Sequence, residues 1–258
     1  MRYALISDIH ANQPALEAVL ASIGRQADVA AIYHLGDLVG YAPWPNETVK
    51  LIQELAIPGV AGNYDSTVGT DYKHCGCRYE DPVQEELSHA SYSWTRRHVS
   101  PETKAFLAGL PFRIDLLPHG GHTAGPRLVL VHASPTLNTL YWTEDRDDAF
   151  CLKMASLAGM KAGDAIAFGH THIPWHRETG GIHFLNTGSV GRPKDGDRRA
   201  GYVLLDVNGR EIRAETIRVS YDVERTMRVI RDSGLPELLA DYLDTGGRLP
   251  SRNSAAST

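Results

Sequence analysis

The chain has 258 residues, of which 42% are hydrophobic and 22% charged, a composition typical of a globular protein with one sizeable α/β domain. Its formal net charge of -5 argues against general nucleic-acid binding, because that function normally requires a surplus of basic residues. Its three cysteines form no disulfide framework, and the apolar N-terminal run is too short for a signal peptide or a membrane span. We therefore expect a cytoplasmic protein that does not enter a membrane.

The first quarter of the chain alternates predicted strands and helices. Short apolar runs predict strands at residues 3–6, 31–35 and 57–61. Apolar side chains at helical spacing predict a helix over about residues 14–25, with Pro14 in its first turn. A second helix is expected at residues 46–55, with Asn46 as its N-cap. Residues 66–109 differ, because a loop rich in Gly, Asp and Cys leads into polar helices near 81–97 and 101–107. We interpret this segment as an insertion that forms a lid or cap over the functional site.

Strands are more frequent in the remainder of the chain. They are predicted at residues 112–117, 128–131, 165–168, 182–185, 201–206 and 211–219. A loop and helix are expected within 138–157, and two helices at 223–232 and 237–242. Residues 1–249 then form one α/β domain of two packed β-sheets flanked by helices. Residues 250–258 have the small polar composition of a disordered tail.

Five short motifs place metal-binding side chains directly after predicted strands. They are Asp8-Ile9-His10, Gly36-Asp37-Leu38-Val39-Gly40, Gly62-Asn63-Tyr64-Asp65, Val131-His132 and Gly169-His170-Thr171-His172. In the Asp-x-His and His-x-His pairs, an extended backbone would direct both side chains to the same side. Taken singly, most of these motifs are explained by a turn, a helix cap or a core histidine. The ordered series at strand ends instead indicates one metal cluster.

The donor types restrict which metals this cluster can hold. Mixed imidazole and oxygen ligands suit Mn, Fe, Co, Ni or Zn better than Mg or Ca, and we expect Mn. Two such divalent ions about 3.5–4 Å apart can clamp the attacking and leaving oxygens of a phosphoryl displacement. The motifs therefore predict a two-metal phosphoesterase.

The same series resembles the calcineurin-like metallophosphoesterases, and most closely their small bacterial and archaeal phosphodiesterase branch. The later run from Asn186 to Gly191, NTGSVG, also resembles that branch, so the resemblance covers most of the chain outside residues 66–109 and the tail. It implies a four-layer α-β-β-α sandwich. It also implies one ion held by Asp8, His10 and His172, a second held by Asn63, His132 and His170, and Asp37 as the bridge.

Tyr64 departs from the family pattern, in which this position is usually the His that protonates the leaving group. A phenol, with a reference pKa of about 10, is a weaker acid than an imidazolium. Three interpretations stay open: Tyr64 donates a hydrogen bond to the phosphate, another His (His34, His74 or His176) supplies the proton, or the leaving group needs none. Packing against the cap is the ordinary alternative. Asp65 is expected to orient a neighbour of the metal ligands.

Other residues carry weaker signals. Arg192, in a basic run after the NTGSVG segment, is a candidate for a substrate phosphate, and Asn12 either contacts substrate or caps the next helix. The His74-Cys75-Gly76-Cys77 run lacks a second Cys pair, so we expect an ordinary exposed loop there instead of a zinc site. Tyr141 and Trp142 either stack on a base or pack in the core.

The sequence thus predicts a metal-dependent phosphodiesterase or phosphatase acting on a small phosphorylated substrate, such as a nucleotide or a dinucleoside polyphosphate. The expected catalytic residues are Asp37, Asn63, Tyr64 and Asp65, and the expected substrate contacts are Asn12, Tyr64 and Arg192. The alternative is a binding or scaffold protein that kept the fold and lost catalysis. A homo-oligomer is left open.

Overall fold

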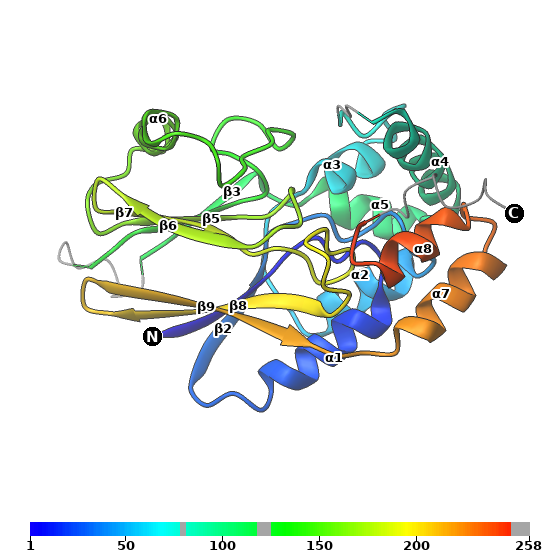
Figure 1. Cartoon of the computed structure of the whole chain (residues 1–258), viewed down its shortest axis with the longest axis horizontal. Coiled ribbons are helices and arrows are strands. Elements are labelled where there is room, and N and C mark those ends of the chain that lie inside the picture. Colours follow the sequence, from blue (N-terminus) through cyan, green and yellow to red (C-terminus); the bar gives the residue numbers. More distant parts are fainter. Residues whose placement is uncertain (78–80, 118–124, 249–258) are drawn as a thin grey trace, which may run out of the picture.

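Two β-sheets lie face to face at the centre of the molecule (Figure 1). The computed structural model describes residues 1–77, 81–117 and 125–248. The first sheet has the order β2-β1-β8-β9, from β1 (Arg2–Ile6), β2 (Val29–His34), β8 (Ala200–Asn208) and β9 (Glu211–Val219). The second has the order β3-β4-β5-β7-β6, from β3 (Arg113–Leu116), β4 (Leu128–Val131), β5 (Ala165–Phe168), β6 (Trp175–Thr179) and β7 (Ile182–Asn186).

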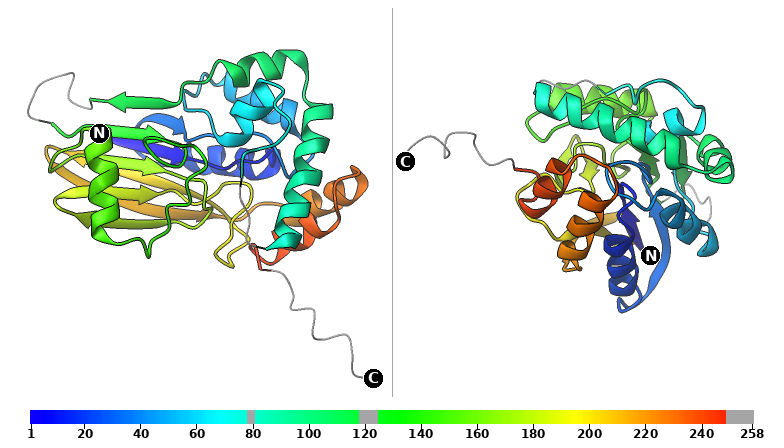
Figure 2. Two further views of the ribbon diagram at one scale, coloured as in Figure 1. Left: turned by 90° about the horizontal axis from the view of Figure 1, so that it is seen from above. Right: turned by 90° about the vertical axis from the view of Figure 1, so that its right-hand side faces the viewer.

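Helices cover both outer faces of the sheet pair. Helices α1 (Gln13–Ile23) and α6 (Asp148–Ala158) lie on opposite sides of it (Figure 1). The others gather at one end of the molecule, as Figure 2 shows from two further directions. They are α2 (Pro45–Glu54), α3 (Asn63–Gly69), α4 (Pro82–His98), α5 (Pro101–Ala108), α7 (Val223–Asp232) and α8 (Leu238–Asp244). None of the helices in the described ranges is long and apolar enough to cross a membrane.

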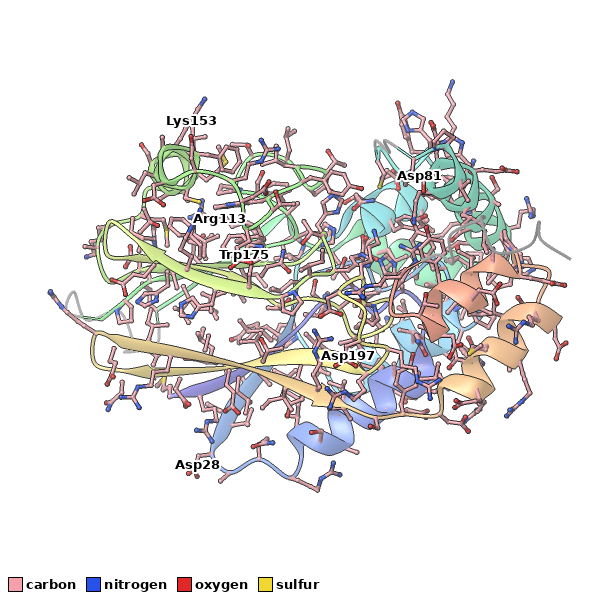
Figure 3. The ribbon with its side chains drawn as sticks, viewed as in Figure 1. Asp28, Asp81, Arg113, Lys153, Trp175 and Asp197 are labelled. Atoms are coloured by element: carbon pink, nitrogen blue, oxygen red, sulfur yellow. The ribbon has the colours of Figure 1, made fainter. Side chains whose placement is uncertain are left out.

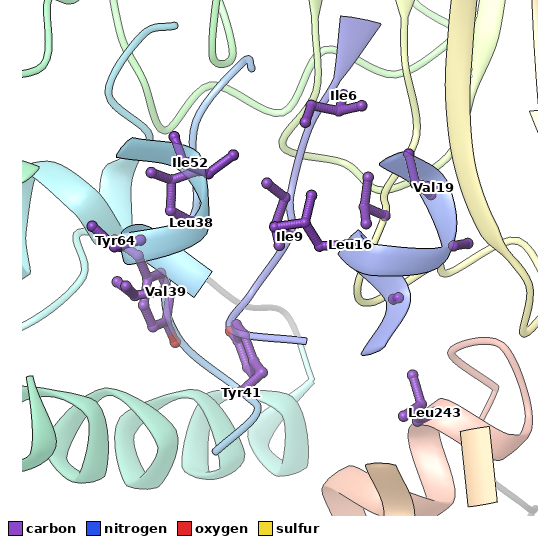
Figure 4. Packing of buried hydrophobic residues seen from close by; sticks show 14 of the residues in the cluster. Ile6, Ile9, Leu16, Val19, Leu38, Val39, Tyr41, Ile52, Tyr64 and Leu243 are labelled. Atoms are coloured by element: carbon purple, nitrogen blue, oxygen red, sulfur yellow. The ribbon is translucent and has the colours of Figure 1, made fainter. Parts of the chain in front are cut away.

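The central strands are buried on both faces, and their side chains alternate between two apolar layers. In β4, Leu128 and Leu130 point to the layer between the sheets, whereas Val129 and Val131 point to the layer under α6. That outer layer includes Trp175, which is labelled in Figure 3. On the other side, β1 and its following loop pack against α1 in a third cluster, part of which Figure 4 shows. The predicted four-layer α-β-β-α fold is therefore confirmed.

Parallel pairing aligns the strand ends that carry the motifs. Strand β1 is parallel to β2 in one sheet, and β4, β5 and β7 are parallel in the other. Because parallel strands end at the same edge, the loops that follow β1, β2, β4 and β5 can meet there. The fold thus brings together residues from both sheets.

Several elements differ from the sequence prediction. Residues 57–61 form no strand and contribute only an isolated bridge between His34 and Gly59. Helix α3 and strand β6 were not predicted. Asn46 is not an N-cap, because α2 begins at Pro45 after Trp44, and its side chain instead bonds to the backbone of His98 and Ser100. The predicted tail at residues 250–258 lies outside the described residues.

Candidate metal centre

All seven predicted metal-binding side chains lie together and are at most 4% exposed. Asp8 and His10 follow β1, and Asp37 follows β2. From the other sheet, His132 follows β4, while His170 and His172 follow β5. Asn63 is the first residue of α3. The cluster is thus built from both sheets and one helix.

The donor atoms form two adjacent groups. Asp8, His10 and His172 make up one group, and Asp37, His132 and His170 the other; within each, the ligand atoms lie within 4.8 Å of one another. Asn63 joins the second group, with its Oδ1 at 3.1 Å from His132 Nε2. This division is the one that the resemblance implied.

Asp37, a member of the second group, also faces the first group. Its Oδ2 is 3.7 Å from His10 Nε2 in one group and 3.5 Å from His132 Nε2 in the other. Its other oxygen, Oδ1, accepts a hydrogen bond from the backbone N–H of Tyr64 at 2.9 Å. One carboxylate oxygen is therefore held by the backbone while the other faces both groups, which is the geometry that a bridging ligand requires.

Backbone carbonyls orient three of the imidazoles. The Nδ1 atoms of His10, His132 and His172 lie 2.6 to 3.0 Å from the carbonyl oxygens of Val39, Leu35 and Arg192, respectively. A proton on Nδ1 satisfies each of these carbonyls and leaves Nε2 with a free lone pair. Each of these Nε2 atoms then points into the cluster.

The cluster contains buried polar atoms that a bound cation would satisfy. Nε2 of His10 lies 3.1 Å from Nε2 of His172, although both carry lone pairs in the tautomers just described. Asp8 Oδ1 and His170 Nε2 are buried without a hydrogen-bond partner. Converging lone pairs and unpartnered acceptors are costly in a buried site, and a positive ion bound between them would remove that cost. The donor set therefore fits two divalent transition-metal ions.

Burial also sets the protonation of these ligands. It lowers the pKa values of His10, His170 and His172 well below the ordinary value, with neighbouring imidazoles adding to the effect for His10 and His170. Their rings are thus neutral near pH 7, which is the form that coordinates a metal. Burial and the nearby Asp65 and Asp8 carboxylates raise the pKa of Asp37. Bound cations would oppose that rise.

The backbone at the ligands is left-handed, not extended. Asp8, His10, Asp37, His170 and His172 all have φ between 49° and 67°. Such values are uncommon for residues other than glycine and cluster at functional sites. The paired side chains of Asp8/His10 and His170/His172 face the cluster through this conformation, so the expected strand-like alternation was wrong.

Residues adjoining the ligands hold this strained backbone in place. Asp65 accepts hydrogen bonds from the N–H groups of Leu38 and Gly62, at 2.8 and 2.9 Å, which ties the loop of Asp37 to α3. A side chain at Gly62 would collide with Asp37. Ser7 donates a hydrogen bond to Asp8, and Asn186 donates one to the carbonyl of Gly169. The sequence reasoning missed Ser7, because a serine before an aspartate carries no recognisable signal.

The hydroxyl of Tyr64 is directed toward α4. It lies 3.1 Å from the hydroxyl of Ser88, and the side chain is 1% exposed. Its ring packs edge-on against His10 and Tyr92. Burial, with weaker contributions from neighbouring groups, raises the pKa of Tyr64 well above its ordinary value. This geometry favours the packing interpretation over proton donation.

A pocket, called the metal pocket below, opens beside the two donor groups, and none of the three histidines considered as substitute proton donors lines it. Besides five of the proposed ligands, its wall consists of Tyr41, Tyr64, Cys77, Tyr141 and Lys194. His34, the last residue of β2, is fully buried, and neither ring nitrogen has a partner. His176 pairs with His183 across β6 and β7, at 3.0 Å. His74 packs against Tyr72 and accepts a bond from the N–H of Gly76. The interpretation in which the leaving group needs no proton therefore gains support.

Asn12 acts as the N-cap of α1. Its Oδ1 accepts a hydrogen bond from the N–H of Ala15, and its Nδ2 donates to Gly191 and Tyr221. Because these internal bonds occupy its polar atoms, the predicted substrate contact is not the role that the geometry favours.

The Cys-rich loop lies closer to the site than expected. Cys75 is 2% exposed, so the prediction of an ordinary exposed loop was wrong for this residue. Cys77 lines the metal pocket, and its Sγ lies 3.0 Å from Asn63 Nδ2. Of the two aromatic candidates, Trp142 is fully buried and stacks on Phe168 in the core, whereas Tyr141 lines the pocket beside His170.

Lys194 also lines the metal pocket, on the same segment as Arg192. Its backbone N–H donates to the carbonyl of His172. Burial and the neighbouring Arg192 lower the pKa of Lys194 to about 7. The sequence showed only a basic run here, and nothing in it distinguished Lys194 from the solvent-exposed members of that run.

Comparison with known proteins places this site in context. Residues 1–210 match the calcineurin-like phosphoesterase superfamily domain. An uncharacterized protein of Methanocaldococcus jannaschii is 31% identical over 94% of this chain and 97% of its own. Phosphodiesterase YfcE of Escherichia coli is 25% identical over 80% of this chain and 88% of its own. A metallophosphoesterase structure from Sphaerobacter thermophilus has a TM-score of 0.73 at 29% identity, covering 95% of this chain and all of that one.

Proposed function

This chain belongs to the calcineurin-like phosphoesterase superfamily, in its small bacterial and archaeal branch, and we propose that it is a two-metal phosphodiesterase or phosphatase of small phosphorylated molecules. The observation that carries the proposal is the position of Asp37 Oδ2 between two groups of buried donors. A bridged pair of ions is the arrangement that in-line phosphoryl displacement uses. Mn is the proposed metal, with Fe, Co, Ni and Zn as alternatives.

Each proposed ligand has a defined task. Asp8, His10 and His172 would hold one ion, and Asn63, His132 and His170 the other, with Asp37 shared. The ions, when bound, would supply Lewis acidity to water and to the phosphoryl group. Asp65 would position the loop that carries Asp37. Arg192 and Lys194 would contribute positive charge to phosphate binding.

The substrate is proposed to have a good leaving group, such as a nucleotide or the phosphate chain of a dinucleoside polyphosphate. Tyr64 supports this, because its hydroxyl is bonded to Ser88 and its pKa is raised, so it offers no acid to a poor leaving group. Residues 66–109 are proposed as a cap over the site, since Cys77 of this segment lines the pocket wall. A cytoplasmic location stays part of the proposal.

The proposal is tested by Mn²⁺-dependent hydrolysis of bis-p-nitrophenyl phosphate, whose aryl leaving group departs readily. Wild-type protein is expected to turn it over, and Asp37→Ala to lose at least about a hundredfold in kcat, because the shared ligand is gone. Leu38→Ala, next in the chain but without a donor atom, is the control for general damage to this loop.

A scaffold protein without catalysis is the competing function, and the Tyr in place of the usual His is the feature in its favour. Absence of turnover by the wild type with each of Mn, Fe, Co, Ni and Zn, in protein shown to bind the metal, would establish this alternative over ours.

A further inference from the structure

Arg192 is a buried cation with almost no polar partner. The residue is 5% exposed, and its Nη1 is buried without a hydrogen bond. Nη2 has one long contact, 3.5 Å to Gln84 Oε1. Among the described residues, no carboxylate forms an ion pair with it. Removing a guanidinium from water is costly unless an anion compensates, so the structural role alone leaves this charge unexplained.

Aromatic rings hold the guanidinium at a fixed place beside the metal centre. Its Cζ lies 4.0 Å from the centroid of the Tyr41 ring and 5.4 Å from that of Tyr242. The Tyr41 ring in turn contacts the metal ligand His10, with centroids 4.8 Å apart. The Arg192 carbonyl faces His172 Nδ1 at 2.6 Å, so the backbone of Arg192 is fixed against a second ligand. Only one aromatic ring therefore separates the cation from the proposed ligands.

A second hollow adjoins the metal pocket at this point. It is a narrow hollow, lined by His10, Asn12, Tyr41, Arg192 and apolar residues of α7 and α8, including Ile230 and Leu243. The metal pocket shares His10 and Tyr41 with it. A group bound to Arg192 and a group bound at the metal centre would therefore share the wall that His10 and Tyr41 form.

We infer that Arg192 forms an anion subsite next to the metal centre, and that the substrates are phosphoesters with a second anionic group, phosphate or carboxylate, a few bonds from the scissile phosphorus. A guanidinium fork binds such oxyanions through two parallel hydrogen bonds, which would use the unpartnered Nη1 and a second N–H of the same fork. The apolar wall of α7 and α8 would contact the atoms between the two anions. This inference rests on the proposed function, since the metal centre is taken to bind the first phosphate.

The subsite is tested with a series of phosphonates of increasing length, whose affinities for the Mn²⁺-loaded protein are measured by calorimetry. The probes are methylphosphonate, phosphonoacetate, 3-phosphonopropionate and 4-phosphonobutyrate, in which the second anion is absent or moves outward. We expect one carboxylated probe to bind the wild type at least about tenfold more tightly than methylphosphonate. In Arg192→Met the affinity ratio of that carboxylated probe to methylphosphonate, both measured on the variant, should fall to about one.

Lys194→Met is the matched control, since it removes the other cation of the same segment. It is expected to weaken all probes alike and to keep the ratio. If Arg192→Met does not fold, Arg192→Lys replaces it, and its ratio should fall because an ammonium cannot bind in the same two-pronged way.

The inference would be overturned if the wild type bound all four probes with equal affinity, or if Arg192→Met still bound the carboxylated probe more tightly than methylphosphonate. It would also be overturned if Arg192→Lys kept the full affinity ratio of these two probes, or if that ratio were lost in Lys194→Met alone. Binding requires no turnover. If the protein binds the phosphonate series as expected but hydrolyses no ester, that result refutes only the enzymatic proposal. Asp37→Ala should weaken every probe, methylphosphonate included, because it disrupts the centre that holds the phosphonate.

Discussion

Tyr64 and His34 are buried ring side chains beside the candidate metal centre, and Tyr64 lines its pocket. The Tyr64 hydroxyl bonds to Ser88 of the following helix, and both nitrogens of His34 are without a partner. Each residue therefore affects the molecule through packing and protonation equilibria. Two predictions at the residue scale follow from their surroundings.

Replacing Tyr64 by Phe should leave catalysis nearly intact and cost stability. Losing the hydrogen bond to Ser88 should lower the free energy of unfolding by about 1 kcal/mol. Turnover of both aryl and alkyl phosphodiesters should stay within about threefold, whereas loss of a general acid would cost about 10²-fold or more for the alkyl ester. Steady-state kinetics on the two esters and urea unfolding give both values. A selective collapse of alkyl-ester turnover would restore Tyr64 as the proton donor.

His34 should make the metal-free protein sensitive to acid. Burial lowers the pKa of His34 from 6.5 to about 3, so between these values the unfolded chain binds the extra proton. The contribution of neutral His34 to stability is complete at pH values above its pKa in the unfolded chain, and it is lost as the pH falls from 6.5 toward 3. The wild type should therefore lose about 1.5 kcal/mol more than His34→Leu between about pH 6.5 and pH 5. Urea unfolding in chelator measures this difference, and parallel pH curves for the two proteins would contradict it.

At the scale of elements, helix α1 connects the first metal-binding loop to the far end of the chain. Its cap, Asn12, bonds to Ala15 in the helix, to Gly191 after β7 and to Tyr221 before α7. The loop with Asp8 and His10 is consequently fixed at both ends, by β1 and by a capped helix.

Asn12→Ala should weaken the fold without altering catalysis by the folded molecules. Loss of the cap and of the hydrogen bonds to Gly191 and Tyr221 should lower the unfolding free energy by about 2 kcal/mol. The value of kcat/KM for bis-p-nitrophenyl phosphate, which has no second anionic group to enter the hollow that Asn12 lines, should change by less than about threefold after correction for the folded fraction. Asn12→Asp keeps the cap oxygens and is the matched control. A larger fall in kcat/KM with unchanged Mn²⁺ affinity would instead support the predicted substrate contact.

At the scale of the whole molecule, the metal centre lies where the two sheets meet. Asp8, His10 and Asp37 follow strands of one sheet, whereas His132, His170 and His172 follow strands of the other. Ions bound here would connect the two sheets. Their binding should therefore be measurable as stability of the entire fold.

Mn²⁺ should bind at two equivalents per chain and raise the unfolding temperature, and a chelator should reverse the rise. At a free metal concentration of about 100 times Kd, each site adds about 2.7 kcal/mol to the free energy of unfolding. Metal analysis after desalting and thermal unfolding with and without chelator provide the measurements. His132→Ala, which removes a ligand of the second group, should retain only one equivalent. One equivalent in the wild type would contradict the two-metal centre.

Local sequence patterns determined the sheet sandwich and the set of clustered donors. Buried strands such as residues 128–131 and 165–168 are short apolar runs, and a donor that follows a parallel strand lies at a predictable edge. Asp8, Asp37, His132 and His170 were therefore identifiable together. Whether these donors bind metal is a prediction that the geometry supports and that the experiments above will test.

Only the tertiary structure decided what the side chains around the cluster do. The direction of the Tyr64 hydroxyl and the burial of Trp142 and Cys75 depend on elements distant in sequence. So does the environment of Arg192, which forms no ion pair with a carboxylate in the described part of the chain. Spacing along the chain predicts on which face of its own strand or helix a side chain lies. It does not record which neighbour occupies the space opposite, because that neighbour is placed by the packing of the whole fold.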